Sequence, residues 1–331
     1  MGIRWSELDV IKHITKSAGP PCPGLVLGIG DDCAVIDPDS AKQLVITTDM
    51  LVEDVHFSCL WHPPYELGRK SIAVNISDIA AMGGTPRYVF VSMCLPETIE
   101  EAWLKAWLNG VESIIKEYGC CLAGGDTVHG EKITINVTLV GTVCRDMAIR
   151  RDSAGVGQSV FVSGPLGSAA AGLLIFQHSN SSRLIEQPFA KPFILRHLNP
   201  APDVRCGQVL AESGLVTSMQ DISDGIATDL SHICATSRIR AEIDESLLPF
   251  HPDLPRVAAS LGCDLTELLI AGGEDYHLVF TVTKNSDDKL LEMMEGHGLS
   301  VYCIGKTVEG EGVFLRSGKE LKDITFGGFE H

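Results

Sequence analysis

The stretch SIAVNISDIAAMGG, residues 71–84, predicts a helix that is apolar on nearly every side and yet contains Asn75 and Asp78. These two polar residues are three positions apart, so they share one face of the helix. An ionised carboxylate in such a segment is costly to bury unless it is paired, hydrogen-bonded or bound to a metal. Asp78 lies in mid-helix, where neither a cap nor a turn explains it. The stretch therefore predicts a buried helix whose aspartate faces a polar partner or a metal ion.

The surrounding sequence alternates strand and helix patterns and predicts an α/β (α+β) protein of two domains. A chain of 331 residues is long enough for two ordinary domains. The charged, glycine-containing stretch 144–159 has no periodicity and is the best boundary, which predicts domains 1–148 and 149–331. In the first domain we expect strands at 43–49, 87–95, 120–127 and 132–143, with helices at 65–82 and 97–119. The 43–49 strand should run into a polar turn, and the 120–127 strand should end in a glycine turn.

The second domain shows three recognisable units. Residues 160–176 and 218–234 predict strand, turn and helix, and residues 268–282 predict helix, turn and strand. Residues 178–205 look irregular, and their role stays open.

The composition excludes several classes of function. The formal net charge of −17 argues against nucleic acids and anionic membranes as partners, because both attract basic surfaces. No apolar run approaches the roughly 18 residues of a membrane span, and the N-terminal 17 residues suggest an amphipathic helix rather than a signal peptide. The 11 cysteines include no CxxC pair and are expected to be reduced. We therefore expect a cytoplasmic protein.

Five short stretches deliver carboxylates into turns rich in Gly, Ser or Thr. Taken singly, most of these carboxylates can be explained by capping or turn formation. That explanation does not apply to Asp78 in mid-helix, and it fits Asp49 poorly, because Asp49 follows a strand of Val, Ile and Thr. Together they are better explained as one shared site, because magnesium takes carboxylate, hydroxyl and carbonyl oxygens and bridges them to substrate phosphates. The stretches are GIGDDCAVI (Asp31, Asp32), VITTDMLVEDVHF (Thr47, Thr48, Asp49, His56), VNISDIAAMG (Asp78), LAGGDT (Asp126) and QDISDG (Asp221, Asp224).

Other phosphate-binding motifs are absent from the sequence. IGKT at 304–307 lacks the earlier glycine of a P-loop and lies in a strand-like context. No GxGxxG motif joins a strand to a helix, and no kinase HRD or DFG set occurs. Metal ions and backbone amides would then replace the usual glycine loop.

Six motifs occur in the order and rough spacing of the thiamine-monophosphate kinase family, which belongs to the superfamily that includes aminoimidazole ribonucleotide synthetase. They are GIGDDCAVI, TTDMLVEDVHF, NISDIAAMGG, GGDT, SDGIATDL and GGEDYHLVFTV, over residues 26–282. The resemblance implies a two-domain aminoimidazole ribonucleotide synthetase-like fold, a homodimer formed through the N-terminal sheet, and ATP with several magnesium ions in a cleft. The reaction would transfer the γ-phosphoryl group of ATP directly to thiamine monophosphate, giving thiamine diphosphate and ADP.

The resemblance also implies roles for individual residues. The metal ligands would be Asp32, Thr47, Thr48, Asp49, Asp78, Asp126, Asp221 and Asp224. Gly125, Asp126, Arg151 and Ser223 would contact ATP, while His56, Glu274 and Phe329 would contact thiamine monophosphate. No dedicated general base is identified. The ending GGFEH places Phe329 where the family often has a tyrosine, so the details of stacking stay open.

Several of these residues have simpler explanations from the sequence alone. Without the resemblance, the sequence favours a core or turn histidine for His56. Arg151 is equally compatible with an interdomain salt bridge, for which Arg150 is an alternative, and Glu274 with a turn cap. Trp103 and Trp107 are expected in a core or a dimer contact rather than against a ligand.

Four other functions remain as rivals. Within the superfamily, a ribonucleotide cyclo-ligase is one. The selenophosphate-forming enzymes are disfavoured, since only Cys22 resembles their reactive residue, and so are the hydrogenase-maturation dehydratases, because the last cysteine is Cys303. A non-catalytic magnesium or nucleotide sensor would not need every acidic turn.

Overall fold

The computed structural model describes residues 23–27, 35–178 and 181–328. Asp31, Asp32, Phe329 and the predicted N-terminal helix lie outside these ranges. By their internal contacts the described residues divide into two compact units, one reaching to Ile79 and including Gly84–Asp146, the other holding Ala80–Gly83 and the chain from Met147 onward. None of the helices in the described ranges combines the length and apolar character that a membrane span requires.

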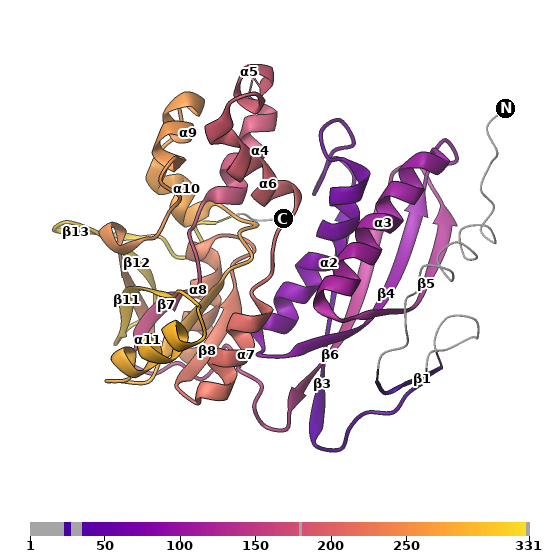
Figure 1. Cartoon of the computed structure of the whole chain (residues 1–331). Helices are drawn as coiled ribbons and strands as arrows, with labels where there is room; N and C mark the ends of the chain where they lie inside the picture. Colours follow the sequence, from indigo (N-terminus) through magenta and orange to yellow (C-terminus); the bar gives the residue numbers. More distant parts are fainter. Residues whose placement is uncertain (1–22, 28–34, 179–180, 329–331) are drawn as a thin grey trace. The chain divides into compact units, whose positions relative to one another are not determined.

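The first unit is a four-stranded sheet in the order β3-β6-β4-β5 with two helices (Figure 1). All neighbouring strands are antiparallel except β4 and β5, which are parallel. A small antiparallel pair, β1 and β2, precedes it. The elements are β1 (Leu25–Leu27), β2 (Val35–Ile36), β3 (Lys42–Val52), α2 (Pro64–Ala81), β4 (Thr85–Leu95), α3 (Glu101–Tyr118), β5 (Cys121–His129) and β6 (Thr134–Cys144).

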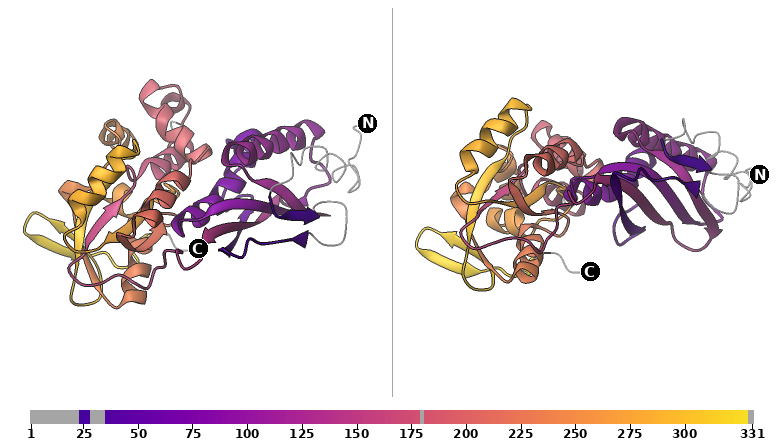
Figure 2. Two further views of the ribbon diagram at one scale, coloured as in Figure 1. Left: turned by 60° about the horizontal axis from the view of Figure 1, so that its bottom comes forward. Right: turned by 90° about the horizontal axis from the view of Figure 1, so that it is seen from below.

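Both helices of this unit lie against the same face of the sheet (Figure 2). They cross closely because Gly68 and Gly110 carry no side chains: a Cβ at Gly68 would lie 2.1 Å from the carbonyl oxygen of Trp107. The predicted helix around Asp78 is confirmed, and its Ile72, Ile76 and Ile79 are almost completely buried. Trp107 is a core residue, as expected.

Two expectations for this unit were wrong in detail. The strand expected at 43–49 continues to Val52, since β6 pairs with it as far as Thr134, so Asp49 lies inside a strand and not at its end. The glycine pair of GGDT also lies within a strand, β5. A Cβ at Gly125 would lie 1.9 Å from the carbonyl oxygen of Val91, so this glycine permits close strand pairing and makes no turn.

The second unit is a seven-stranded mixed sheet in the order β13-β12-β9-β11-β7-β10-β8, with helices packed on both faces. One core is formed mainly with α4, α6, α8, α9 and α10, and the other with α7 and α11. The elements are β7 (Ser159–Val162), α4 (Ser168–Gln177), α5 (Ser181–Ile185), η1 (Pro188–Ala190), α6 (Lys191–Leu198), α7 (Val204–Ser213), β8 (Val216–Asp221), α8 (Ile226–Ser237), β9 (Arg240–Asp244), η2 (Glu245–Leu247), α9 (Leu254–Leu261), α10 (Leu265–Ala271), β10 (Leu278–Val282), α11 (Asp287–Gly296), β11 (Tyr302–Val308), β12 (Gly312–Ser317) and β13 (Glu320–Asp323).

The three strand–helix or helix–strand pairs expected in this half of the chain are confirmed as β7–α4, β8–α8 and α10–β10. IGKT lies in strand β11, which agrees with its rejection as a P-loop. The segment 178–205 was expected to be irregular, but most of its described part is helical, including α6. Helix α6 is stabilised by packing that the sequence pattern does not reveal, because Gly172 of α4 lets the backbone of Phe193 approach closely.

Candidate functional site

Two carboxylates of the first unit lie together between strand β3 and helix α2. The alternation of the strand directs Thr47 and Asp49 to the face that α2 covers. The Oγ1 of Thr47 donates a hydrogen bond of 2.5 Å to Oδ2 of Asp78 on α2. Burial, together with the charge of Asp78 and a hydrogen bond to it, raises the pKa of Asp49 from 3.8 to about 7. At neutral pH the pair therefore resists carrying two negative charges.

This donor set fits a hard divalent cation. Two carboxylates and a hydroxyl supply oxygen ligands, which magnesium prefers, and a cation would remove the repulsion that raises the pKa of Asp49. Within the described ranges no three His, Cys, Asp or Glu side chains form a complete metal cage. A magnesium site that keeps waters and uses substrate phosphates does not require one.

Thr48 lies on the opposite face of β3 from Thr47 and Asp49. Its hydroxyl is exposed and lies 3.4 Å from Oδ1 of Asn136 and 3.1 Å from the hydroxyl of Thr138, both on β6. The structure therefore separates the Thr48 side chain from the carboxylate pair, and only its main chain could join the same ligand set.

Asp126 is separated from the pair as well. It lies on β5, at the opposite edge of the sheet from β3. Thr127 next to it is buried while Asp126 is exposed, so Asp126 belongs to the face that carries Thr48. Its Oδ1 accepts a hydrogen bond of 2.8 Å from the amide of Thr127. Within one chain, the structure does not bring Asp126 and its neighbour Gly125 to Asp49 and Asp78.

His56 lies in the turn that follows β3. The amide of Val52 donates a 3.0 Å hydrogen bond to its Nδ1. Because Nδ1 accepts, a neutral His56 carries its proton on Nε2. Nε2 is then the donor of the ring, and a phosphate oxygen can accept from such a group.

In the second unit, Asp221 is the last residue of β8, and Ser223 and Asp224 lie in the loop between β8 and α8. A residue that the sequence analysis missed, Asp229, organises this loop. Its Oδ2 accepts hydrogen bonds of 3.0 Å from the amides of both Ser223 and Asp224. Its Oδ1 accepts one of 2.8 Å from Nε2 of Gln220. One feature of the sequence could have indicated Asp229: it lies in the first turn of the helix that directly follows the acidic loop.

The environment of Asp229 is strongly unfavourable for a further negative charge. Burial raises its pKa well above 3.8, and the charges of Asp221 and Asp224 add to this effect. The loop therefore concentrates carboxylates in the same way as the pair in the first unit, and it too fits a cation better than it fits a free phosphate.

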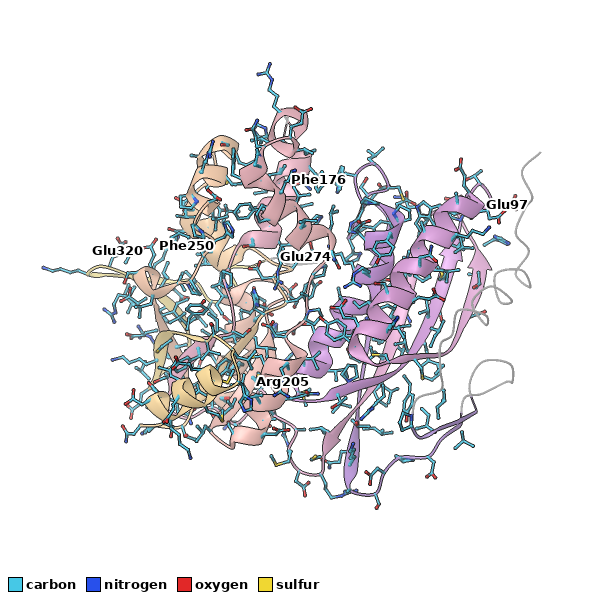
Figure 3. The ribbon with its side chains drawn as sticks, viewed as in Figure 1. Glu97, Phe176, Arg205, Phe250, Glu274 and Glu320 are labelled. Carbon is cyan, nitrogen blue, oxygen red and sulfur yellow. The ribbon has the colours of Figure 1, made fainter. Side chains whose placement is uncertain are left out.

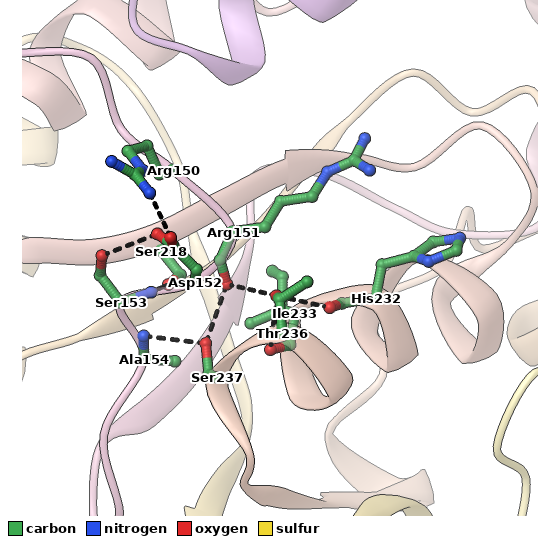
Figure 4. A network of polar contacts seen from close by, with 10 residues as sticks. All are labelled: Arg150, Arg151, Asp152, Ser153, Ala154, Ser218, His232, Ile233, Thr236 and Ser237. Atoms are coloured by element: carbon green, nitrogen blue, oxygen red, sulfur yellow. Dashed lines mark hydrogen bonds and ion pairs between the residues drawn. The ribbon is translucent and has the colours of Figure 1, made fainter.

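Arg151 follows the end of the first unit and is anchored through its main chain (Figure 4). Its carbonyl oxygen accepts hydrogen bonds from the hydroxyls of Ser218 (3.2 Å), Thr236 (3.1 Å) and Ser237 (2.9 Å). The guanidinium extends to the same side of this network as the ring of His232. Burial and the charge of Arg151 lower the pKa of His232, and Asp224 partly offsets this. Arg151 is thus held near the acidic loop.

Its rival Arg150 forms an exposed ion pair with Asp152.

Glu274 (labelled in Figure 3) lies in the loop between α10 and β10. Its amide donates a 2.7 Å hydrogen bond to the carbonyl of Ser223, so this loop is directly tied to the acidic loop. Its carboxylate Oε2 lies 2.9 Å from Nδ1 of His197, a buried residue that the sequence analysis also missed. The structure therefore brings Glu274 together with Ser223 and Asp224.

Comparisons with known proteins show the family of the chain. The family model for AIR synthase related protein, N-terminal domain, matches residues 30–143, and that for the C-terminal domain matches residues 155–318. The thiamine-monophosphate kinase of Bacillus subtilis is 37% identical over 302 residues, 90% of each chain. That of Haemophilus influenzae is 34% identical over 330 residues, covering 98% of this chain and 97% of the other.

Solved structures give the same result. The thiamine-monophosphate kinase of Stenotrophomonas maltophilia has a TM-score of 0.81 at 33% identity and covers 95% of this chain and 96% of that chain. The structure of AaThiL complexed with AMPPCP and TMP has a TM-score of 0.75 at 32% identity, covering 97% of this chain and 98% of that chain. The chain therefore belongs to the thiamine-monophosphate kinase family of AIR synthase related proteins.

Proposed function

We propose that this chain transfers the γ-phosphoryl group of ATP to the phosphate of thiamine monophosphate, giving thiamine diphosphate and ADP. The observation that supports this most directly is the carboxylate pair of Asp49 and Asp78, which fits a cation that accompanies phosphates. The relatives named thiamine-monophosphate kinase support thiamine monophosphate as the acceptor. The complex of AaThiL with an ATP analogue and TMP supports ATP as the donor and thiamine monophosphate as the acceptor.

The residues of the chain would act mainly by binding and orienting. The acceptor phosphate has a second pKa of about 6, so it is largely ionised at neutral pH and needs no general base. Bound magnesium would neutralise charge on the phosphates and so favour in-line transfer. Asp49, Asp78 and the loop of Asp221 and Asp224 would hold the cations, and Arg151 would contact a phosphate of ATP. His56 and Glu274 would hold thiamine monophosphate.

We also propose a homodimer formed through the sheet of the first unit. Among the described residues, the face opposite α2 and α3 is covered only near Tyr88, by β1 and β2. Along β3 it exposes Leu44 (41%), Ile46 (65%) and Met50 (54%). A row of exposed aliphatic side chains on one sheet face is typical of an interaction surface. The same face of a second copy would bury this row.

A cytoplasmic location remains a prediction.

The experiment is chromatographic detection of thiamine diphosphate from thiamine monophosphate and ATP, with magnesium or with EDTA. We expect magnesium-dependent product from the wild type, loss of product in Asp78→Asn, and normal product in Asp54→Asn. Asp54 is a suitable control because it is exposed and forms a surface ion pair with Lys132. Hydrolysis of ATP without thiamine diphosphate would contradict the proposed acceptor.

A further inference from the structure

We propose that His197 and Arg196, at the end of α6, are positioning residues that fix Glu274 for the acceptor substrate. This inference rests on the proposed function, in which Glu274 contacts thiamine monophosphate. It adds residues from the segment 178–205, for which the sequence indicated no role. The loop 272–278 carries Glu274, and contacts from several elements hold its conformation.

The loop contains two strained residues. Glu274 has φ of 65° and Tyr276 has φ of 50°, values that side chains other than glycine rarely adopt. Tyr276 is bulky and buried, so the surrounding structure must impose this conformation. Such strain persists only where neighbouring groups over-determine the backbone.

Asp275, between the two strained residues, is one such constraint. Its carboxylate accepts hydrogen bonds from the amides of Gly167 (2.6 Å) and Ala169 (3.0 Å), at the start of α4. These amides have no partner within the helix, so Asp275 satisfies them and in turn fixes the loop to α4.

A directed chain of hydrogen bonds closes around the loop. Nη2 of Arg196 donates to the carbonyl oxygen of Asp275 and lies 2.9 Å from Nε2 of His277. A guanidinium only donates, so Nε2 of His277 accepts and Nδ1 carries the proton. That Nδ1 lies 2.8 Å from Oδ2 of Asp203, to which the hydroxyl of Ser163 also donates.

The last hydrogen bond of this series returns to the loop. The hydroxyl of Ser163 accepts a 2.7 Å hydrogen bond from the amide of Leu278. Each donor in this chain therefore faces an acceptor, and the main chain is held at Asp275 and at Leu278. Arg196 thus fixes the main chain of the segment that carries the strained Glu274.

His197, the next residue, acts on the carboxylate. Its side chain is 1% exposed and its Nδ1 lies 2.9 Å from Oε2 of Glu274, which is 26% exposed. The buried imidazole thus lies within ion-pair distance of one oxygen of a partly exposed carboxylate and attracts it when protonated. The amide of Glu274 is bonded to Ser223, so the carboxylate is fixed relative to the acidic loop as well. A fixed carboxylate loses less conformational freedom when substrate binds, which favours affinity for the acceptor.

The test measures kinetics of the full-length protein for His197→Asn, with His297→Asn as the matched control at an exposed position of the same unit. We expect KM for thiamine monophosphate to rise about tenfold in His197→Asn, as for loss of one polar contact. KM for ATP and kcat should change less than about twofold, because ground-state binding of one substrate is affected. Glu274→Gln should raise the same KM, and the double variant should show no further increase.

Several outcomes would overturn the assignment. Unchanged KM for thiamine monophosphate in His197→Asn, or additive effects in the double variant, would show that His197 does not act through Glu274. A parallel loss in kcat and in affinity for ATP would indicate a merely structural role. If His197→Asn does not fold, Arg196→Lys tests the main-chain contact to the same loop, since it keeps the charge but not the planar donor group, and it should raise KM for thiamine monophosphate and not KM for ATP.

The failure of the proposed function is distinguishable from these outcomes. A wild type that makes no thiamine diphosphate would overturn the proposed function, and this assignment with it. An active wild type with an unaltered His197→Asn variant would overturn the assignment alone.

Discussion

The carboxylates of Asp49 on β3 and Asp78 on α2 are hydrogen-bonded neighbours, and this proximity together with burial raises the pKa of Asp49 to about 7. The hydroxyl of Thr47 completes the contact by donating to Asp78. Two carboxylates held in this way destabilise the metal-free protein, while they provide ligands for a cation.

The first prediction is that Asp49→Asn separates stability from activity. We expect a higher melting temperature than wild type in EDTA, because the variant removes the repulsion with Asp78. In magnesium, kcat should fall by about a hundredfold or more, since a cation ligand is lost. Thermal unfolding and product formation measured on the same samples check this. A variant that is both less stable and fully active would contradict the assignment of the pair.

The second prediction concerns pH. The pKa of Asp49 is about 7 in the folded protein and 3.8 in the reference state, so between these values the unfolded chain has lost a proton that the folded chain retains. The contribution of Asp49 to the free energy of unfolding therefore falls as pH rises from about 4 to about 7, and is constant above that. Below about pH 4 both states are protonated and the contribution vanishes.

We expect Asp49→Asn to exceed the wild type in stability by about 2 kcal/mol at pH 8 in EDTA, and by clearly less at pH 5. Urea unfolding of both proteins at the two pH values gives this difference directly. Magnesium should reduce the difference at pH 8 by binding the ionised pair. A difference that grows toward low pH would have the wrong sign for a raised pKa.

The third prediction distinguishes two substitutions at Asp229. In Asp229→Asn, the remaining oxygen can still accept from the amides of Ser223 and Asp224. The new amide can donate to Oε1 of Gln220, which has no hydrogen-bond partner among the described residues, once the Gln220 amide rotates. We therefore expect near wild-type stability and activity for this variant.

Asp229→Ala instead leaves both loop amides without an acceptor. We expect a loss of about 1–3 kcal/mol in the free energy of unfolding, with a fall in kcat, because the loop carrying Asp221 and Asp224 loosens. Equal behaviour of the two variants in urea unfolding and turnover would argue against this role.

The fourth prediction tests the proposed dimer. Ile46→Glu places a charge in the middle of the exposed row on β3, and we expect a monomer by light scattering coupled to gel filtration. Val55→Glu, outside the row but equally exposed at 64%, is the control and should leave the mass of the wild type unchanged. A monomeric wild type would contradict the dimer.

Much of the fold was predictable because its signals are local. The buried helix around Asp78, the αL cap at Gly119 and the strand alternation of β6 follow from periodicity and from glycine chemistry. The extension of β3 past Asp49 was not predictable, because it depends on pairing with a strand more than 80 residues away.

The sequence by itself determined which residue types could bind cations and phosphates, and the order of the motifs that identify the family. Tertiary structure decided which of these residues meet. It placed Thr48 and Asp126 on the face opposite Asp49, and it added Asp229 and His197, whose spacing in sequence gives no indication of their contacts. The physical reason is that side-chain direction along a strand is a local property, whereas strand order and loop strain are set by packing between distant segments.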